Sequence, residues 1–97
     1  MARYFFNEFD GQYKIDDRGL ELPTLEKARL EAVKYAGEAM RDQPELAWKG
    51  DEFRVEVTDN NRLLLFTVIV LGVEAPAGGT SLNPALKKPS AQDTPQP

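Results

Sequence analysis

Residues 53–71 read FRVEVTDNNRLLLFTVIVL and contain the clearest structural signal in the chain. Phe53, Val55 and Val57 alternate with polar residues, which is typical of a β-strand with one buried face. Residues 60–61 are both asparagine, a residue that tolerates the positive φ angles of tight turns. An apolar run follows directly. The segment therefore predicts a β-hairpin.

A two-residue turn would fix the register of this hairpin. It places apolar residues opposite one another on one face, namely Val57 with Leu64, Val55 with Phe66 and Phe53 with Val68. A slip of one residue would turn all of them to the other face, so the hydrophobic pattern supports this register.

The second strand of the hairpin is apolar on its other face as well. The residues on that face are Leu63, Leu65, Ile69 and Leu71. A strand that is apolar on both faces is normally central in its sheet or covered by a second layer. We therefore expect this strand to lie inside the sheet or beneath another surface.

An aromatic stretch at residues 3–9 predicts the other hairpin. It is followed by Asp-Gly at 10–11, a strong signal for a two-residue hairpin turn, and then by residues 12–16. The expected cross-strand pairs are Phe9 with Gln12, Glu8 with Tyr13 and Phe6 with Ile15. Residues 20–22 follow as a short extended piece.

A helix is predicted from Leu25 to about Asp42, with Thr24 as its N-cap. Apolar residues recur at helical spacing along one face. They are Leu25, Ala28, Ala32, Val33, Tyr35, Ala36, Ala39 and Met40. Arg29 lies within this apolar stripe and is its one charged member.

These elements predict an α+β fold of the order ββαββ over residues 1–75, with one helix on one face of a four-stranded, mainly antiparallel sheet. Residues 76–97 contain five of the seven prolines and no aromatic residue, so they are expected to form a disordered tail.

The helix-free face of this sheet is a candidate interface. If the last strand lies beside the first, six apolar residues gather there: Phe5, Phe9, Leu63, Leu65, Ile69 and Leu71. Apolar area of this kind marks contact sites on soluble proteins. The sequence thus favours an interaction module that forms a homodimer or binds another protein.

Composition excludes several classes of function. The chain has no histidine and no cysteine, and its only serines are Ser81 and Ser90, which excludes zinc fingers, disulfide scaffolds and Ser/Cys–His hydrolases. We expect no enzymatic activity, metal or cofactor.

Charge and hydropathy bear on the partners. Residues 1–75 contain ten basic and fifteen acidic residues, a net charge of −5, whereas nucleic-acid-binding surfaces are basic. The longest apolar run, 63–73, is shorter than the roughly 20 residues of a membrane-spanning helix. We expect a cytoplasmic protein that binds neither nucleic acid nor membrane.

Several short motifs, in order along the chain, resemble one known family. They are RYFF at 3–6, DG at 10–11, Asp17 with Gly19, ELP at 21–23 and AR at 28–29. Over about residues 2–70 the chain resembles the family described as domain of unknown function 6894, found in short proteins of rhizobia and related alphaproteobacteria. The family has no established activity, so the resemblance implies a single small domain and no particular reaction. Many relatives carry histidine where this chain has Asn7, so a role that needs an imidazole there would be lost.

Two polar clusters are weighed as alternatives. Asp10, Asp16, Asp17 and Glu21 could offer oxygen ligands to Mg²⁺ or Ca²⁺, but their spacing does not fit an EF-hand loop, and turn chemistry is the preferred explanation. Arg29 could reach Asp17 or Glu21 as an ion pair. It could instead hold an anion, which makes a binding module for a small anionic ligand, near Arg29 and the 16–21 loop, the alternative function.

Overall fold

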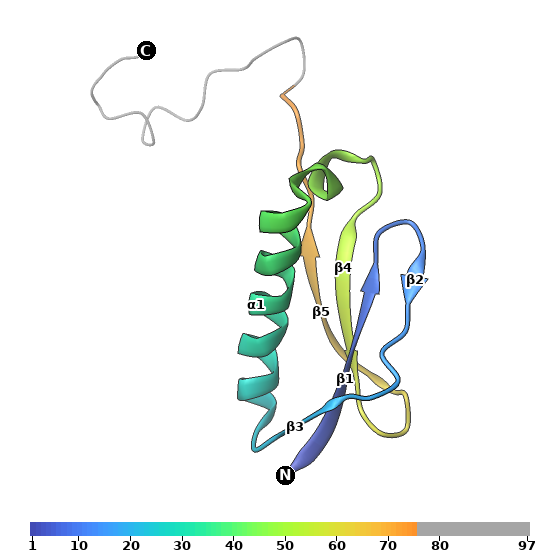
Figure 1. The fold of residues 1–97 in the computed structure, drawn as a ribbon, viewed down its shortest axis with the longest axis vertical. Coiled ribbons are helices and arrows are strands. Elements are labelled where there is room, and N and C mark those ends of the chain that lie inside the picture. Colours follow the sequence, from blue (N-terminus) through green and yellow to red (C-terminus); the bar gives the residue numbers. More distant parts are fainter. Residues whose placement is uncertain (76–97) are drawn as a thin grey trace, which may run out of the picture.

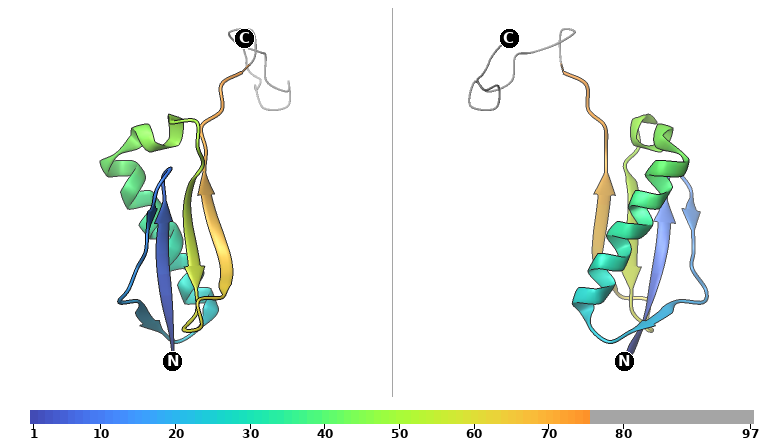
Figure 2. Two further views of the ribbon diagram at one scale, coloured as in Figure 1. Left: turned by 90° about the vertical axis from the view of Figure 1, so that its right-hand side faces the viewer. Right: turned by 60° about the vertical axis from the view of Figure 1, so that its left-hand side comes forward.

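The computed structural model describes residues 1–75 and confirms the α+β fold. Its elements are β1 (Ala2–Phe9), β2 (Tyr13–Lys14), β3 (Leu20–Leu22), α1 (Leu25–Asp42), the 3₁₀ helix η1 (Pro44–Trp48), β4 (Phe53–Thr58) and β5 (Leu64–Val70). The sheet is antiparallel with the order β2-β1-β4-β5, and α1 lies across one of its faces (Figures 1 and 2). The proline-rich tail predicted at 76–97 lies outside the described residues.

The sheet has five strands instead of four because the chain returns along β1 in two separate pieces. β2 pairs with the end of β1 and β3 with its start, through Glu8↔Lys14 and Tyr4↔Leu20. Between these pairs, residues 15–19 lie opposite residues 5–7. The longer side must bulge out of the ladder, and this interruption shapes the candidate site described below.

The predicted register of the first hairpin is wrong by one residue. Phe9 pairs with Tyr13 instead of Gln12, and Glu8 pairs with Lys14 instead of Tyr13. The predicted pair of Phe6 with Ile15 does not form. The turn holds three residues, in which Gly11 has φ of 105° and the Asp10 side chain accepts from the Gln12 amide at 3.3 Å. The shift turns Tyr13 to the helix-free face beside Phe9, with ring centroids 4.8 Å apart.

The predicted register of the second hairpin is wrong by two residues from Phe53 to Val57, which leaves Phe66 and Val68 on their predicted face. The ladder then bulges between Val57 and Thr58, and Thr58 pairs with Leu64. The observed pairs are Val57↔Phe66, Val55↔Val68 and Phe53↔Val70. The turn is longer than predicted because the Asp59 carboxylate accepts from the amides of Asn61 and Leu63, at 2.8 and 3.1 Å. The residue with positive φ is Arg62, at 63°.

The predicted position of the last strand is also wrong. β4, not β5, lies beside β1, and β5 forms the edge furthest from β2 (Figure 2). β4 lies at the centre of the sheet beneath the helix, where its Phe53, Val55 and Val57 are each 0 % exposed. β5 is thus apolar on both faces while lying at an edge.

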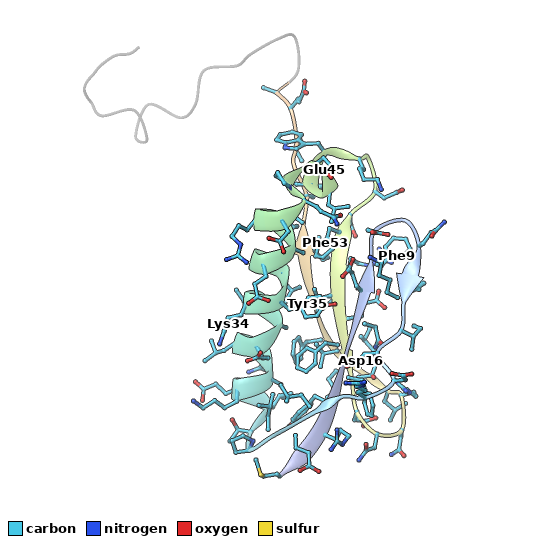
Figure 3. The ribbon with its side chains drawn as sticks, in the orientation of Figure 1. Phe9, Asp16, Lys34, Tyr35, Glu45 and Phe53 are labelled. Carbon is cyan, nitrogen blue, oxygen red and sulfur yellow. The ribbon has the colours of Figure 1, made fainter. Side chains whose placement is uncertain are left out.

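The helix has the predicted bounds, and Thr24 Oγ1 accepts from the Lys27 amide at 3.1 Å. Its buried stripe is narrower than predicted and consists of Ala28, Ala32 and Ala36. Leu25, Val33 and Tyr35 are exposed. The small alanines let α1 lie close to the sheet, and Leu46 of η1 closes the end of this core. Figure 3 shows Tyr35 and Phe53 between helix and sheet, and Lys34 pointing away.

Candidate functional site

Polar residues of β4 divide the helix-free face of the sheet. Arg54 donates to Glu56 at 2.9 Å and to Glu52 at 3.3 Å, and Thr58 continues the row. Because β4 lies between β1 and β5, this row separates the aromatic residues of β1 from the leucines of β5. The continuous apolar face expected from the sequence is therefore two surfaces.

The β1 surface is covered by the chain's own arginines. The Arg62 guanidinium lies 4.2 Å from the centroid of the Phe5 ring, and that of Arg54 lies 4.2 Å from the centroid of the Phe9 ring. Phe5 is buried and Phe9 half-buried. These two rings have cation–π partners within the chain, so they offer little apolar area to another molecule.

The β5 surface is open. Five side chains along it, which we call the β5 strip, are exposed by 40–62 %: Leu63, Leu64, Leu65, Ile69 and Leu71. No residue between Arg62 and Glu74 is charged. Within residues 1–75, β5 has a strand neighbour on one side alone, namely β4. The strip therefore presents apolar side chains together with an unpaired backbone edge.

The chain leaving β5 is fixed against η1. The Gly72 amide donates to the Ala47 carbonyl at 2.7 Å, and a Cβ on Gly72 would lie 2.7 Å from atoms of the Trp48 ring. Trp48 is itself exposed. Its ring lies beside Gly72, the residue that follows the β5 strip.

Two side chains replace the strand hydrogen bonds that are lost at the 15–19 bulge. Asp16 Oδ2 accepts from the Phe6 amide at 3.1 Å, and its Oδ1 accepts from the amides of Arg18 and Gly19 at 3.0 and 3.1 Å. Asn7 Oδ1 accepts from the Asp16 amide at 2.9 Å, and its Nδ2 donates to the Glu56 carbonyl at 3.1 Å. Asp16 thus has the predicted turn role, and buried Asn7 ties the bulge to β4.

The carboxyl of Asp16 is held in its ionised form. Burial alone would raise its pKa, but the amides of Phe6, Gly19 and Arg18 and the charge of Arg62 outweigh burial and hold the pKa below its ordinary value.

The structure does not bring the predicted anion-site residues together. Arg29 is exposed and forms no ion pair with any residue in 1–75. Glu21 instead pairs with Arg3 at 3.5 Å, and Asp17 is exposed. The arginine that reaches this loop is Arg62, which donates to the Asp16 carbonyl at 3.1 Å.

We expect Arg29→Ala to change the free energy of unfolding by less than about 0.5 kcal/mol, as for other exposed positions without a partner. Thermal denaturation followed by circular dichroism measures this. A loss above about 1 kcal/mol would instead support the ion-pair hypothesis.

Arg62 also lines a hollow of about 280 Å³ on the helix-free face, together with Asn7, Tyr13, Ile15, Glu56 and Thr58. Thr58 is 9 % exposed, and its Oγ1 is a buried side-chain oxygen without a hydrogen-bond partner among the described residues. Sequence reasoning missed Arg62 and Thr58 because they meet Asn7 and Tyr13 only through the strand order. The alternation along residues 53–58 did place Thr58 on this face.

A second polar cluster lies on the helix side of the sheet. Glu8 is buried, accepts from the Tyr35 hydroxyl at 3.2 Å and pairs with Lys14 at 3.5 Å. Burial and the charge of Glu8 raise the pKa of Tyr35. Both oxygens of Glu8 have partners, so this cluster ties α1 to β1. Within residues 1–75, no group of three or more acidic side chains is arranged to hold a metal ion.

Among residues 1–75, no helix combines the length and the apolar character needed to cross a membrane. No curated protein and no solved structure matches the chain. A family model described as "Domain of unknown function (DUF6894)" matches residues 3–72, which is more than half of the chain and covers the elements from β1, without its first residue, to β5. The chain therefore belongs to the DUF6894 family.

Proposed function

We propose that this chain is a small, non-enzymatic interaction module that binds protein through the β5 strip. The observation that carries the proposal is an edge strand that is apolar on both faces and has no charge from residue 63 to residue 73. This shifts the interface expected from the sequence, because Phe5 and Phe9 leave it and Leu64 joins Leu63, Leu65, Ile69 and Leu71.

The exposure of β5 is unusual for a strand that, within residues 1–75, has a neighbour on one side alone. Soluble proteins protect sheet edges with lysine, proline or very short strands, because an open edge recruits other chains. The opposite edge fits this rule, since β2 has two residues. β5 has seven residues and none of these protections. A seven-residue apolar edge is best explained as a contact surface.

Site-specific photo-crosslinking in producing cells tests the proposal. A benzophenone amino acid at position 69 is expected to give covalent protein adducts, identified by mass spectrometry, whereas the same group at position 34 gives none. Lys34 is an exposed residue on α1 and serves as the control. Absence of adducts at position 69 would contradict the proposal.

A cytoplasmic location and a rhizobial or related source stay predictions of the sequence.

A second candidate function is the binding of a small anionic ligand, moved from Arg29 to the hollow beside Arg62. The unpartnered Thr58 hydroxyl favours it, because buried polar groups nearly always have partners. Arg62 donates one of its five N–H groups to Asp16, which leaves others to bind a carboxylate. Ile15 and the Tyr13 ring provide apolar walls. A compact carboxylic acid suits this lining.

Thr58→Val separates stability from binding. We expect it to raise the free energy of unfolding by about 1 kcal/mol, because the near-isosteric methyl removes an unsatisfied hydroxyl. If the hollow binds a carboxylate, calorimetric titration with acetate, benzoate and citrate should show affinity in the original chain and at least a tenfold loss in Thr58→Val and in Arg62→Gln. A Thr58→Val variant less stable than the original chain would contradict the claim that the Thr58 hydroxyl is unsatisfied. Titrations that release no heat with any of the three acids would contradict the proposed carboxylate site.

A further inference from the structure

We infer that β5 pairs antiparallel with β5 of a second copy of this chain, across a two-fold axis at Thr67. The inference rests on the proposed function and names the partner. It differs from the dimer expected from the sequence, in which two helix-free faces pack together. The two sheets would instead join edge to edge into one continuous sheet.

The charge distribution favours the β5 edge over the rest of the surface as the place where two copies of the chain meet. Residues 1–75 carry a net charge of −5, so two copies repel one another where their charged surfaces meet. Residues 63–73 carry no charge. Two β5 edges can therefore approach without like-charge contacts, and each provides the backbone donors and acceptors that the other lacks.

The polar row on β4 favours edge pairing over face packing. Packing the helix-free faces together would remove Arg54, Glu56 and Arg62 from water. Burying such charges costs free energy even when they are paired. Edge pairing leaves these side chains in solvent and brings residues of the β5 strip into cross-strand contact on both faces.

The distribution of side chains selects one register. A two-fold axis makes each contact occur twice, so residues equally spaced about the axis pair with one another. Thr67 is the midpoint of Leu64–Val70, and an axis there aligns the full length of both strands. The resulting pairs are Leu63 with Leu71, Leu64 with Val70, Leu65 with Ile69 and Phe66 with Val68.

This register uses each exposed residue of the strip. Leu63 pairs with Leu71 and Leu65 with Ile69, and Leu64, which lies opposite Thr58 at the bulge of the β4–β5 ladder, pairs with Val70. Thr67 faces its own copy, and threonine pairs across strands form hydrogen bonds. The axis is normal to the sheet, so both α1 helices lie on the same side of the joined sheet.

The absence of cysteine gives a direct test of the register in the purified full chain. Thr67→Cys is expected to form a disulfide-linked dimer under mild oxidation, because paired Cα atoms about 4.5–5.5 Å apart lie within disulfide reach. Leu65→Cys alone should not form one, whereas the double variant Leu65→Cys/Ile69→Cys should. Gln12→Cys, exposed in the first turn, is the control and should stay unlinked.

Light scattering measures the association itself. We expect a solution mass of twice 10.9 kDa for the full chain. Ile69→Lys should raise the dimer dissociation constant at least tenfold, because it brings charge into the pairing. Leu30→Lys makes the same change at a similarly exposed position on α1 and should leave the mass unchanged. Circular dichroism confirms that both variants are folded.

Each outcome bears on the inference. A monomer from micromolar to submillimolar concentration would overturn it, and adducts of another protein at position 69 would then still support the proposed function. A dimer in which Thr67→Cys does not cross-link, or in which Gln12→Cys cross-links equally well, would overturn the edge pairing. No adduct at position 69 in cells, together with a monomer in vitro, would overturn both the inference and the proposed function.

Discussion

Asp16→Ala is expected to lower the free energy of unfolding by about 2–4 kcal/mol, because the Asp16 carboxylate accepts from three backbone amides at the 15–19 bulge. Hydrogen bonds to a charged group contribute about 1.5–3 kcal/mol each, and water reaching this half-buried site would recover part of the loss. The Phe6 amide would lose its partner in the middle of β1. Urea denaturation at neutral pH measures the change.

Asp17→Ala is the matched control for Asp16→Ala. It removes an adjacent carboxylate that is exposed and makes no contact used by the bulge, so a change below about 0.5 kcal/mol is expected. Asp16→Asn should fall between the two, because one amide oxygen still accepts while the charge is lost. Equal effects of the Asp16→Ala and Asp17→Ala variants would contradict the bridging role of Asp16.

Asp16 should also make stability depend on acid pH. Its pKa in the folded chain lies below the ordinary value of 3.8, so the unfolded chain binds its proton first as pH falls. The contribution of Asp16 is therefore fully present above pH 3.8 and is lost as pH falls through the folded-state pKa. Between neutral pH and acid, the stability difference between the original chain and Asp16→Asn should shrink.

The sequence alone predicted the local elements well and their pairing poorly. Helix bounds follow from Thr24 and the apolar period, and the strands follow from alternation at Phe53, Val55 and Val57. Both registers were wrong, since Asp59 and Gln12 lengthen turns that the dipeptides 60–61 and 10–11 suggested were short. Turn length depends on side-chain hydrogen bonds that form only when both strands are in place.

At the candidate site, too, the local pattern was predictable from the sequence and the pairing of strands was not. The apolar run at 63–71 predicted a strand that is apolar on both faces and lies inside the sheet or beneath another surface. Within residues 1–75 the strand lies at an edge instead, with Leu65 and Ile69 exposed. The strand order was not predictable, because any neighbour of β5 satisfies an apolar pattern. The positions of Arg62 and Thr58 beside Asn7 depend on that order, so no local pattern could indicate the hollow.

Gly19→Ala is the second change with a large expected effect, a loss of about 2–4 kcal/mol in the free energy of unfolding. Gly19 has φ of 74°, in the left-handed region that costs other residues about 1–2 kcal/mol. A Cβ there would lie 2.8 Å from Cγ of Arg3, 2.9 Å from Cε2 of Phe5 and 3.0 Å from the Tyr4 carbonyl oxygen. The arginine can move, but the backbone oxygen belongs to the β1–β3 pairing and cannot move without breaking it.

Gly37→Ala is the control for Gly19→Ala, and we expect it to change the free energy of unfolding in the opposite direction. Gly37 lies within α1, and an added Cβ would meet nothing within 4 Å, so alanine should stabilise the chain by about 0.5–1 kcal/mol. Urea denaturation of both variants compares one added methyl group in two environments. Neither glycine lies in the β5 strip, so the solution mass of each folded variant should equal that of the original chain. A change of mass in Gly19→Ala below its unfolding transition would show that the bulge, and not β5 alone, takes part in self-association.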